Sequence, residues 1–174
     1  VRKLMVVITA SPTLHLPRWR KLCGKLVKNA GMLSRDAGTC WRSTYDTLNA
    51  FLEFRTVVEA MTRNHENGLS DVKFMDEDWL IITQLKDVLE VFKQASLLFS
   101  VKDAANLADV IPIMDSIDII LEARPSSTQY HDSIRTALAL ARRTLKSYHN
   151  KTGASDAYRV AILLHPQYKT SYWK

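Results

Sequence analysis

The spacing of its apolar residues constrains the fold of this chain more than any other feature, because they recur every three or four positions in successive segments. The longest such segment, Met75 to Phe99, spans about 24 residues, or roughly 36 Å of helix. Its apolar positions are Trp79, Ile82, Leu85, Val88, Leu89, Phe92, Ala95, Leu98 and Phe99. This is the spacing of an amphipathic helix, and a helix of that length has to pack against others.

The same spacing predicts five more helices, separated by loops in which Gly, Pro, Asn and Ser are frequent. They cover approximately residues 18–29, 43–63, 106–121, 129–150 and 155–164. Either Ser43 or Thr44 can cap the 43–63 helix, and Pro112 either kinks the 106–121 helix or lies in its first turn. Residues 32–39 are expected to form a loop or a short extended piece. The fold class predicted from these patterns is mainly α.

The composition excludes several classes of protein. Hydrophobic residues make up 47% of the chain, but they form no apolar run long enough to predict a membrane span. We interpret the short apolar run of residues 4–10 as an interior segment of a longer protein. Cys23 and Cys40 are expected to be reduced thiols, and the scattered histidines have no partner at the spacing of zinc ligands.

Two groups of acidic residues are candidates for a metal site, but both have a simpler explanation. The run Asp76, Glu77 and Asp78 lies in the first turn of a predicted helix, where negative charge is favourable. Asp115 and Asp118 share a helical face, which we interpret as a solvated acidic face because no third ligand has suitable spacing. We therefore predict no metal ligand and no catalytic residue in this chain.

Charge is distributed unevenly along the sequence. Up to Arg42 there are nine Lys or Arg residues against one acid, whereas residues 43–133 carry seven bases and sixteen acids. Residues 134–174 carry eight bases and one acid. A polyanion such as DNA is expected to be attracted to the two basic ends and repelled by the acidic middle.

The basic N-terminal part contains the candidate DNA-binding residues. The residues that could contact phosphates are Arg18, Arg20, Lys21, Lys25 and Lys28, and Trp41 could stack on an exposed base. Such stacking contributes about 1–3 kcal/mol per base. The alternative is that Trp41 is a core aromatic and the basic side chains are merely solvated, and composition does not choose between the two.

Three blocks of sequence, in order along the chain, carry a resemblance to a known family. They are DAGTCWRSTYDTL at residues 36–48, NLADVIPIMDSID at residues 106–118 and YRVAILLHPQYK at residues 158–169. Together they resemble the hAT superfamily of DNA transposases, whose pattern for the first block is D-x-x-T-R-W-N-S-T-Y-x-M-L. The second block is similar to the helical insertion domain of that family, and the third to its L-[DH]-P-R-Y-K element.

The resemblance implies a ribonuclease H-like catalytic core interrupted by a helical insertion, in a nuclear protein that also has a zinc finger and a dimerisation region. Its reaction is Mg²⁺-dependent hydrolysis and strand transfer at DNA ends. By position, residues 1–42 correspond to a basic remnant of the core and residues 43–174 to the insertion domain. We then expect the catalytic carboxylates and the zinc finger to lie outside this chain. The dimerisation region is also expected outside it, and any homo-oligomer would form through that region.

Within the first block, Trp41 matches the family tryptophan, which is suited to stacking on DNA at the cleavage junction. Cys40 replaces the preceding arginine, and a thiol cannot make the bidentate phosphate contact of a guanidinium. Arg42 replaces an asparagine and could partly restore the charge. In the third block, Gln167 replaces an arginine. The expected function is DNA binding and structural support in a hAT-like transposase, without catalysis by this chain alone. The alternative is a domesticated helical module that binds proteins.

Overall fold

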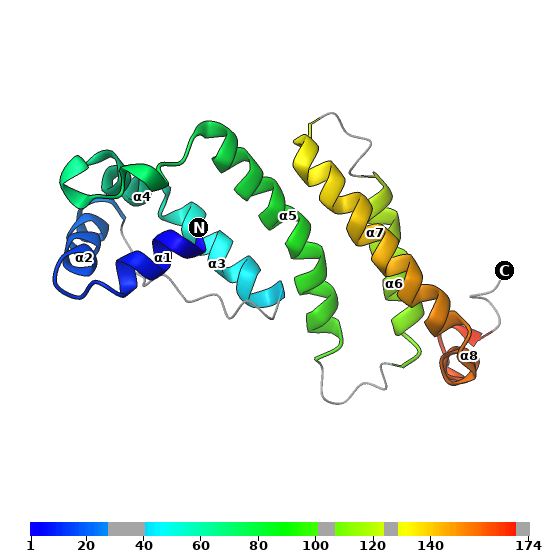
Figure 1. Cartoon of the computed structure of the whole chain (residues 1–174). Helices are drawn as coiled ribbons and strands as arrows, with labels where there is room; N and C mark the ends of the chain where they lie inside the picture. Colours follow the sequence, from blue (N-terminus) through cyan, green and yellow to red (C-terminus); the bar gives the residue numbers. More distant parts are fainter. Residues whose placement is uncertain (28–40, 101–106, 124–128, 170–174) are drawn as a thin grey trace. The chain divides into compact units, whose positions relative to one another are not determined.

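The computed structural model in Figure 1 describes residues 1–27, 41–100, 107–123 and 129–169. Every regular element in these ranges is helical, which confirms the mainly α fold. The α-helices are α1 (Arg2–Thr9), α2 (His15–Leu26), α3 (Trp41–Glu53), α4 (Arg55–Arg63), α5 (Asp76–Leu98), α6 (Val110–Ala123), α7 (Asp132–Gly153) and α8 (Asp156–Leu164), with short 3₁₀ helices η1 (His65–Asn67) and η2 (Ser70–Val72). The helices α1 and α2 lie in the segment expected to be a core remnant, and its ribonuclease H-like character stays a prediction.

The chain divides into two compact units, Val1–Lys93 (unit 1) and Gln94–Lys174 (unit 2). The boundary expected from the family resemblance, after residue 42, lies inside unit 1, just after the start of α3. In this unit α4 packs against both α2 and α3, so helices from the two sides of residue 42 share one core. The assignment of the two sides to different parts of a transposase stays a prediction.

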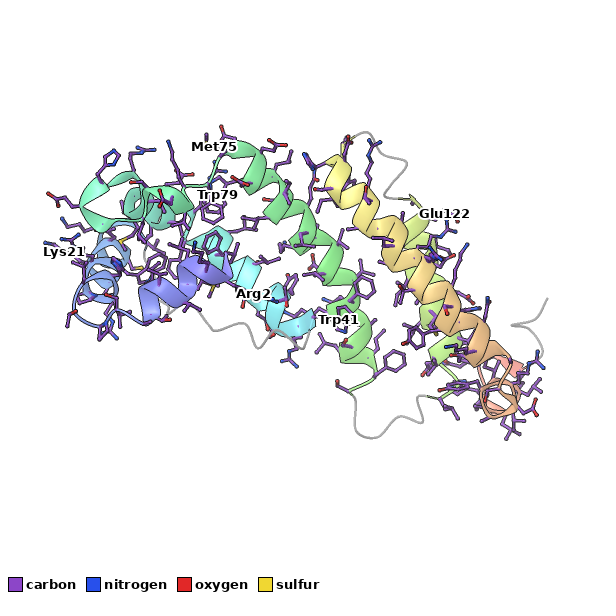
Figure 2. The ribbon with its side chains drawn as sticks, in the orientation of Figure 1. Arg2, Lys21, Trp41, Met75, Trp79 and Glu122 are labelled. Atoms are coloured by element: carbon purple, nitrogen blue, oxygen red, sulfur yellow. The ribbon has the colours of Figure 1, made fainter. Side chains whose placement is uncertain are left out.

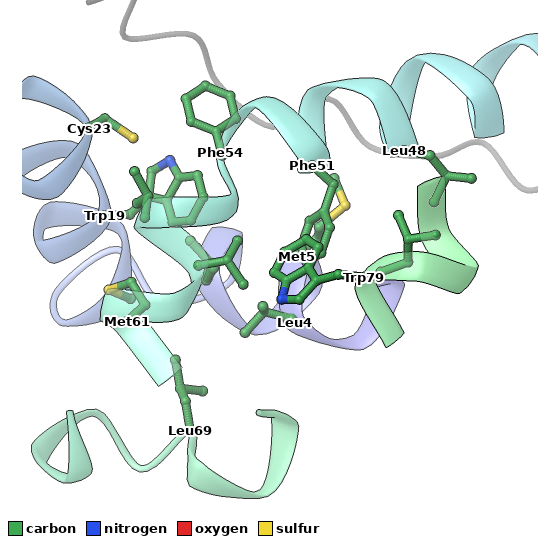
Figure 3. Packing of buried hydrophobic residues seen from close by; sticks show 14 residues of the cluster. Leu4, Met5, Trp19, Cys23, Leu48, Phe51, Phe54, Met61, Leu69 and Trp79 are labelled. Atoms are coloured by element: carbon green, nitrogen blue, oxygen red, sulfur yellow. The ribbon is translucent and has the colours of Figure 1, made fainter. Parts of the chain in front are cut away.

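The core of unit 1 is rich in aromatic residues, as Figure 3 shows. Phe51 of α3 is fully buried, and its ring lies 5.3 Å from that of Trp79 and 5.2 Å from that of Phe74, between centroids. Trp19 of α2 meets the ring of Phe54 edge-on at 5.4 Å. Offset and edge-on contacts between aromatic rings stabilise a core by more than the burial of their apolar surface alone.

The helix α1 was not predicted from the sequence. It consists of the apolar run near the N-terminus, and its buried residues are Leu4, Met5 and Ile8. These positions lie on one face of a helix, but eight residues are too few to show a periodic pattern by themselves. Burial of that face in the core of unit 1 is what stabilises α1.

The prediction of a single helix over residues 43–63 is wrong, because the chain turns at Phe54 and forms two helices, α3 and α4. The backbone of Phe54 (φ −92°, ψ 14°) leaves the helical region there. This turn lets Phe51 of α3 and both Val57 and Val58 of α4 reach the same core, in which all three are fully buried. The periodicity of apolar residues continues through the turn and therefore conceals it.

Unit 2 is built on α6 and α7, which pack closely on each other, with α8 against α7. Pro112 lies in the first turn of α6, one of the two places predicted for it. The hydroxyl of Tyr168 donates a hydrogen bond of 2.6 Å to Asp109, which fastens the segment after α8 to the segment just before α6. That bond, together with burial, raises the pKa of Tyr168.

Candidate nucleic-acid interface

The helix α2 carries a basic face opposite its buried face. Trp19 and Cys23 are 2% and 1% exposed in the core, and burial raises the pKa of the Cys23 thiol. Arg20, Lys21 and Lys25 project from the other side of the helix and are exposed. No carboxylate of the described residues pairs with these three cations, which we call the α2 cations. They are available to the phosphates of a nucleic acid.

Arg18 differs from its neighbours because its guanidinium is bound within the protein. One of its terminal nitrogens, Nη1, donates to the carbonyl oxygen of Glu66 at 3.2 Å and to the side-chain oxygen of Asn67. Asn67 is buried and also donates to the carbonyl of Met61 at 2.8 Å. Arg18 therefore fastens α2 to η1, and its contact with phosphate stays a prediction.

Trp41 and Arg42 are the first two residues of α3, and both are exposed. The side chain of Trp41 is 61% exposed, so the interpretation of this residue as a core aromatic is wrong. Its indole stacks on the ring of Phe92 in α5, with 5.8 Å between centroids and 23° between planes. This contact orients the indole while most of its surface remains open, an arrangement suited to stacking on a base.

Two lysines of α5 that sequence patterns did not single out lie at the ring of Tyr45, and each is paired with a carboxylate. The ammonium of Lys93 lies 4.2 Å from the centroid of the Tyr45 ring and 2.8 Å from Oδ1 of Asp46. Lys86 lies 5.8 Å from the same ring. Tyr45 follows Trp41 by one helical turn, but the two lysines come from α5, and no local pattern connects them with α3.

The structure does not gather the predicted residues into one site. Figure 2 places Lys21 of α2 and Trp41 of α3 at opposite ends of unit 1. Lys28 and Cys40 lie outside the described residues. The predicted set therefore comprises an α2 surface and a separate surface at the start of α3.

In unit 2, the expectation that Asp115 and Asp118 form a solvated acidic face is wrong. Asp118 accepts two hydrogen bonds from Arg142 of α7, at 2.8 Å from Nε and 3.2 Å from Nη2. The same Arg142 contacts Glu122 at 2.7 Å. Nε2 of His149 lies 2.8 Å from Oδ1 of Asp115, close enough for an ion pair when the imidazole is protonated. Both aspartates thus face α7.

Breaking this network at Arg142 should destabilise the protein in a way that depends on pH. The hydrogen bonds from Arg142 lower the pKa of Asp118. A lowered pKa stabilises the fold above the unfolded value of about 3.9 and ceases to do so as the pH falls through the folded value. We expect Arg142→Gln to lower the midpoint of urea denaturation clearly at pH 7 and much less near pH 2, where the Asp118 carboxylate becomes protonated.

The neighbouring Arg143 provides the control, because it is exposed and makes no ion pair with any described residue. Arg143→Gln should change stability by less than about 0.5 kcal/mol at either pH. Equal effects of the two substitutions, or a loss at Arg142 that is the same at pH 7 and pH 2, would show that the bond to Asp118 contributes nothing.

None of the helices in the described ranges is long and apolar enough to cross a lipid bilayer. Within the same ranges, no three His, Cys, Asp or Glu side chains are grouped so that they could hold a metal ion. Comparison of the chain with protein-family models, curated proteins and solved structures finds no match. The resemblance to hAT transposases thus rests on three blocks of sequence.

Proposed function

We propose that this chain is a DNA-binding and supporting part of a hAT-like transposase that acts in the nucleus, and that it does not cleave DNA by itself. The metal-dependent chemistry would come from carboxylates outside the chain, as the family resemblance implies. The chain would contribute contacts with the DNA backbone and a helical scaffold, and any oligomer would form through other regions.

The α2 cations are the observation that carries this proposal. Arg20, Lys21 and Lys25 are exposed, and no described carboxylate neutralises them. The buried contacts of Trp19 and Cys23 hold the helix against the core, so the three charges are presented together on a fixed element. Lys and Arg that contact phosphates release counterions, which supplies most of the free energy of nonspecific DNA binding.

The direct test is the binding of the purified chain to a DNA duplex of arbitrary sequence. We expect a dissociation constant of about 10⁻⁴–10⁻⁶ M at physiological salt, with a steep fall in affinity as salt is raised. DNA incubated with the chain and Mg²⁺ or Mn²⁺ should remain intact. Metal-dependent nicking would contradict the proposal that this chain does not cleave DNA by itself. A lack of binding to DNA at low salt would contradict the proposed DNA-binding function.

Removing the indole of Trp41 should affect single-stranded and hairpin DNA more than duplex DNA. Bases that are not stacked in a duplex are free to stack on the open indole surface, and each such contact contributes about 1–3 kcal/mol. We expect Trp41→Ala to weaken binding to single-stranded DNA by that amount, as measured by fluorescence anisotropy, and to leave duplex affinity nearly unchanged.

Tyr148 of α7 is a matched control, because it is also an aromatic residue that is 61% exposed. Tyr148→Ala should leave both affinities unchanged, while Trp41→Phe should retain part of the preference for single strands. An equal loss on the two kinds of DNA after Trp41→Ala would mean that the indole acts only through its contact with Phe92.

A second candidate function is that of a helical protein-interaction module, and exposed apolar side chains in unit 2 favour it. Ile119, Leu140 and Leu164 are 66%, 61% and 77% exposed on α6, α7 and α8. Apolar surface of this kind can mark a protein interface. Stable self-association in analytical ultracentrifugation, together with no DNA binding at low salt, would favour this function over the first.

A further inference from the structure

Unit 1 has a pocket of about 290 Å³ between α4 and the segment that leads into α5. Arg55, Glu59 and Arg63 line it from α4, and Lys73 and Asp76 line it from the other side. We call it the α4–α5 pocket. Its residues belong to the stretch 43–133, whose net charge is negative, so composition does not indicate a local basic site there.

Two of the three cations in the α4–α5 pocket are available to a ligand. Arg63 and Lys73 are exposed, and no carboxylate of the described residues pairs with either. They lie ten positions apart in the sequence, and η1 and η2 between them turn the chain so that both face one pocket. Two unpaired cations at one concave site attract an anion with at least two acceptor oxygens.

The third cation, Arg55, is held in a defined place by its neighbours. Its guanidinium lies 2.8 Å from Glu59, 3.2 Å from Asp76 and 5.1 Å from the centroid of the Trp79 ring. The side chain of Asp76 is fully exposed, so its ion pair with Arg55 is screened by water and contributes little to stability,. An anion can take the place of Asp76 beside Arg55 at little cost.

The pocket lies on a helix that contacts the helix of the α2 cations. The helix α4, which lines it, packs directly against α2, and Arg18 ties α2 to η1 just beyond the end of α4. Helices in contact lie about 8–10 Å apart between their axes, whereas each DNA strand presents a phosphate about every 3.4 Å along the duplex axis. A short stretch of one duplex is thus long enough to reach both elements.

We infer that the α4–α5 pocket binds a phosphate of the DNA backbone through Arg63 and Lys73, and that it extends the surface formed by the α2 cations. This inference rests on the proposed DNA-binding function and adds a second, separate place of contact. Arg55 lies beside the bound phosphate and contributes positive charge to it. Sequence-specific contact is not involved, because backbone phosphates carry no base information.

The test compares the salt dependence of duplex binding for the wild-type chain and for Arg63→Ala/Lys73→Ala. Each lost phosphate contact makes the slope of log affinity against log salt shallower by about 1, so the double variant, which loses one contact, should have a slope shallower by about 1. The charge-conserving variant Arg63→Lys/Lys73→Arg should keep the wild-type slope. Both side chains are exposed and lie outside the core, so neither variant alters the buried core of unit 1.

The outcomes separate this inference from the function on which it rests. Suppose that Arg63→Ala/Lys73→Ala keeps the wild-type salt dependence of duplex binding, while substitution of the α2 cations makes that dependence shallower. The pocket is then not a phosphate site, and the DNA-binding function stands. If the wild-type chain does not bind duplex DNA, both are overturned. If a poly-glutamate peptide, but not a duplex, loses affinity on Arg63→Ala/Lys73→Ala, the pocket serves an acidic protein and the inference is overturned.

Discussion

Phe51→Ala should lower the free energy of unfolding by about 3–5 kcal/mol, the usual cost of removing a buried phenylalanine ring. The ring of Phe51 is fully buried and contacts those of both Phe74 and Trp79, so the substitution removes two aromatic contacts and leaves a cavity. Neighbouring side chains that are themselves closely packed cannot fill such a cavity without strain. Urea denaturation followed by far-UV circular dichroism would measure the loss.

Leu80→Ala is the matched control, because Leu80 follows Trp79 on α5 but is 47% exposed. Its substitution removes apolar atoms next to the same core without opening a buried cavity, and should cost less than about 1 kcal/mol. If Phe51→Ala costs no more than Leu80→Ala, the aromatic cluster does not organise unit 1 as described.

Removing the α2 cations should make the salt dependence of duplex binding much shallower. We expect the triple variant Arg20→Ala/Lys21→Ala/Lys25→Ala to reduce the slope of log affinity against log salt by about 3, or about 1 for each lost phosphate contact. The fold should be retained, because all three side chains are exposed and the buried face of α2 is unchanged. Fluorescence anisotropy between about 50 and 200 mM salt covers the range in which such contacts change affinity most.

A second triple variant tests whether duplex binding depends on the position of the cations or only on the net charge of the chain. Arg143, Lys151 and Arg159 are exposed cations of α7 and α8 in unit 2, and their replacement by alanine removes the same charge. We expect this variant to keep most of the wild-type slope. An equal loss in the two triple variants would show that DNA follows the overall charge of the chain and that α2 is not a defined phosphate surface.

The existence and type of the long helices could be predicted from the sequence, because each buries one face and its apolar residues therefore repeat at the helical period. The expectation for Met75 to Phe99 agrees closely with α5, which begins at Asp76 with three acids in its first turn. The division into α3 and α4 at Phe54 could not be predicted. Both helices bury residues in one core, so the spacing of apolar residues stays helical across the turn.

The candidate site was predictable in part for the same reason. The cations of α2 alternate with buried residues at helical spacing, so exposure of Arg20, Lys21 and Lys25 follows from the pattern,. The engagement of Arg18 by η1 does not follow, because its acceptors lie about fifty positions away in the sequence. Nor does the pairing of Asp118 with Arg142, which depends on how α6 meets α7.

The sequence alone determined the helical class of this protein, the basic character of α2 and the resemblance on which its proposed function rests. All three depend on residues that are near one another along the chain, and their spacing and charge can be read directly from the amino-acid sequence. Only the tertiary structure decided that Trp41 is exposed against Phe92, that Asp118 is paired and that Arg63 and Lys73 share a pocket. Each of these depends on which helices meet and at what angle, and that is set by packing of the whole core rather than by any local pattern.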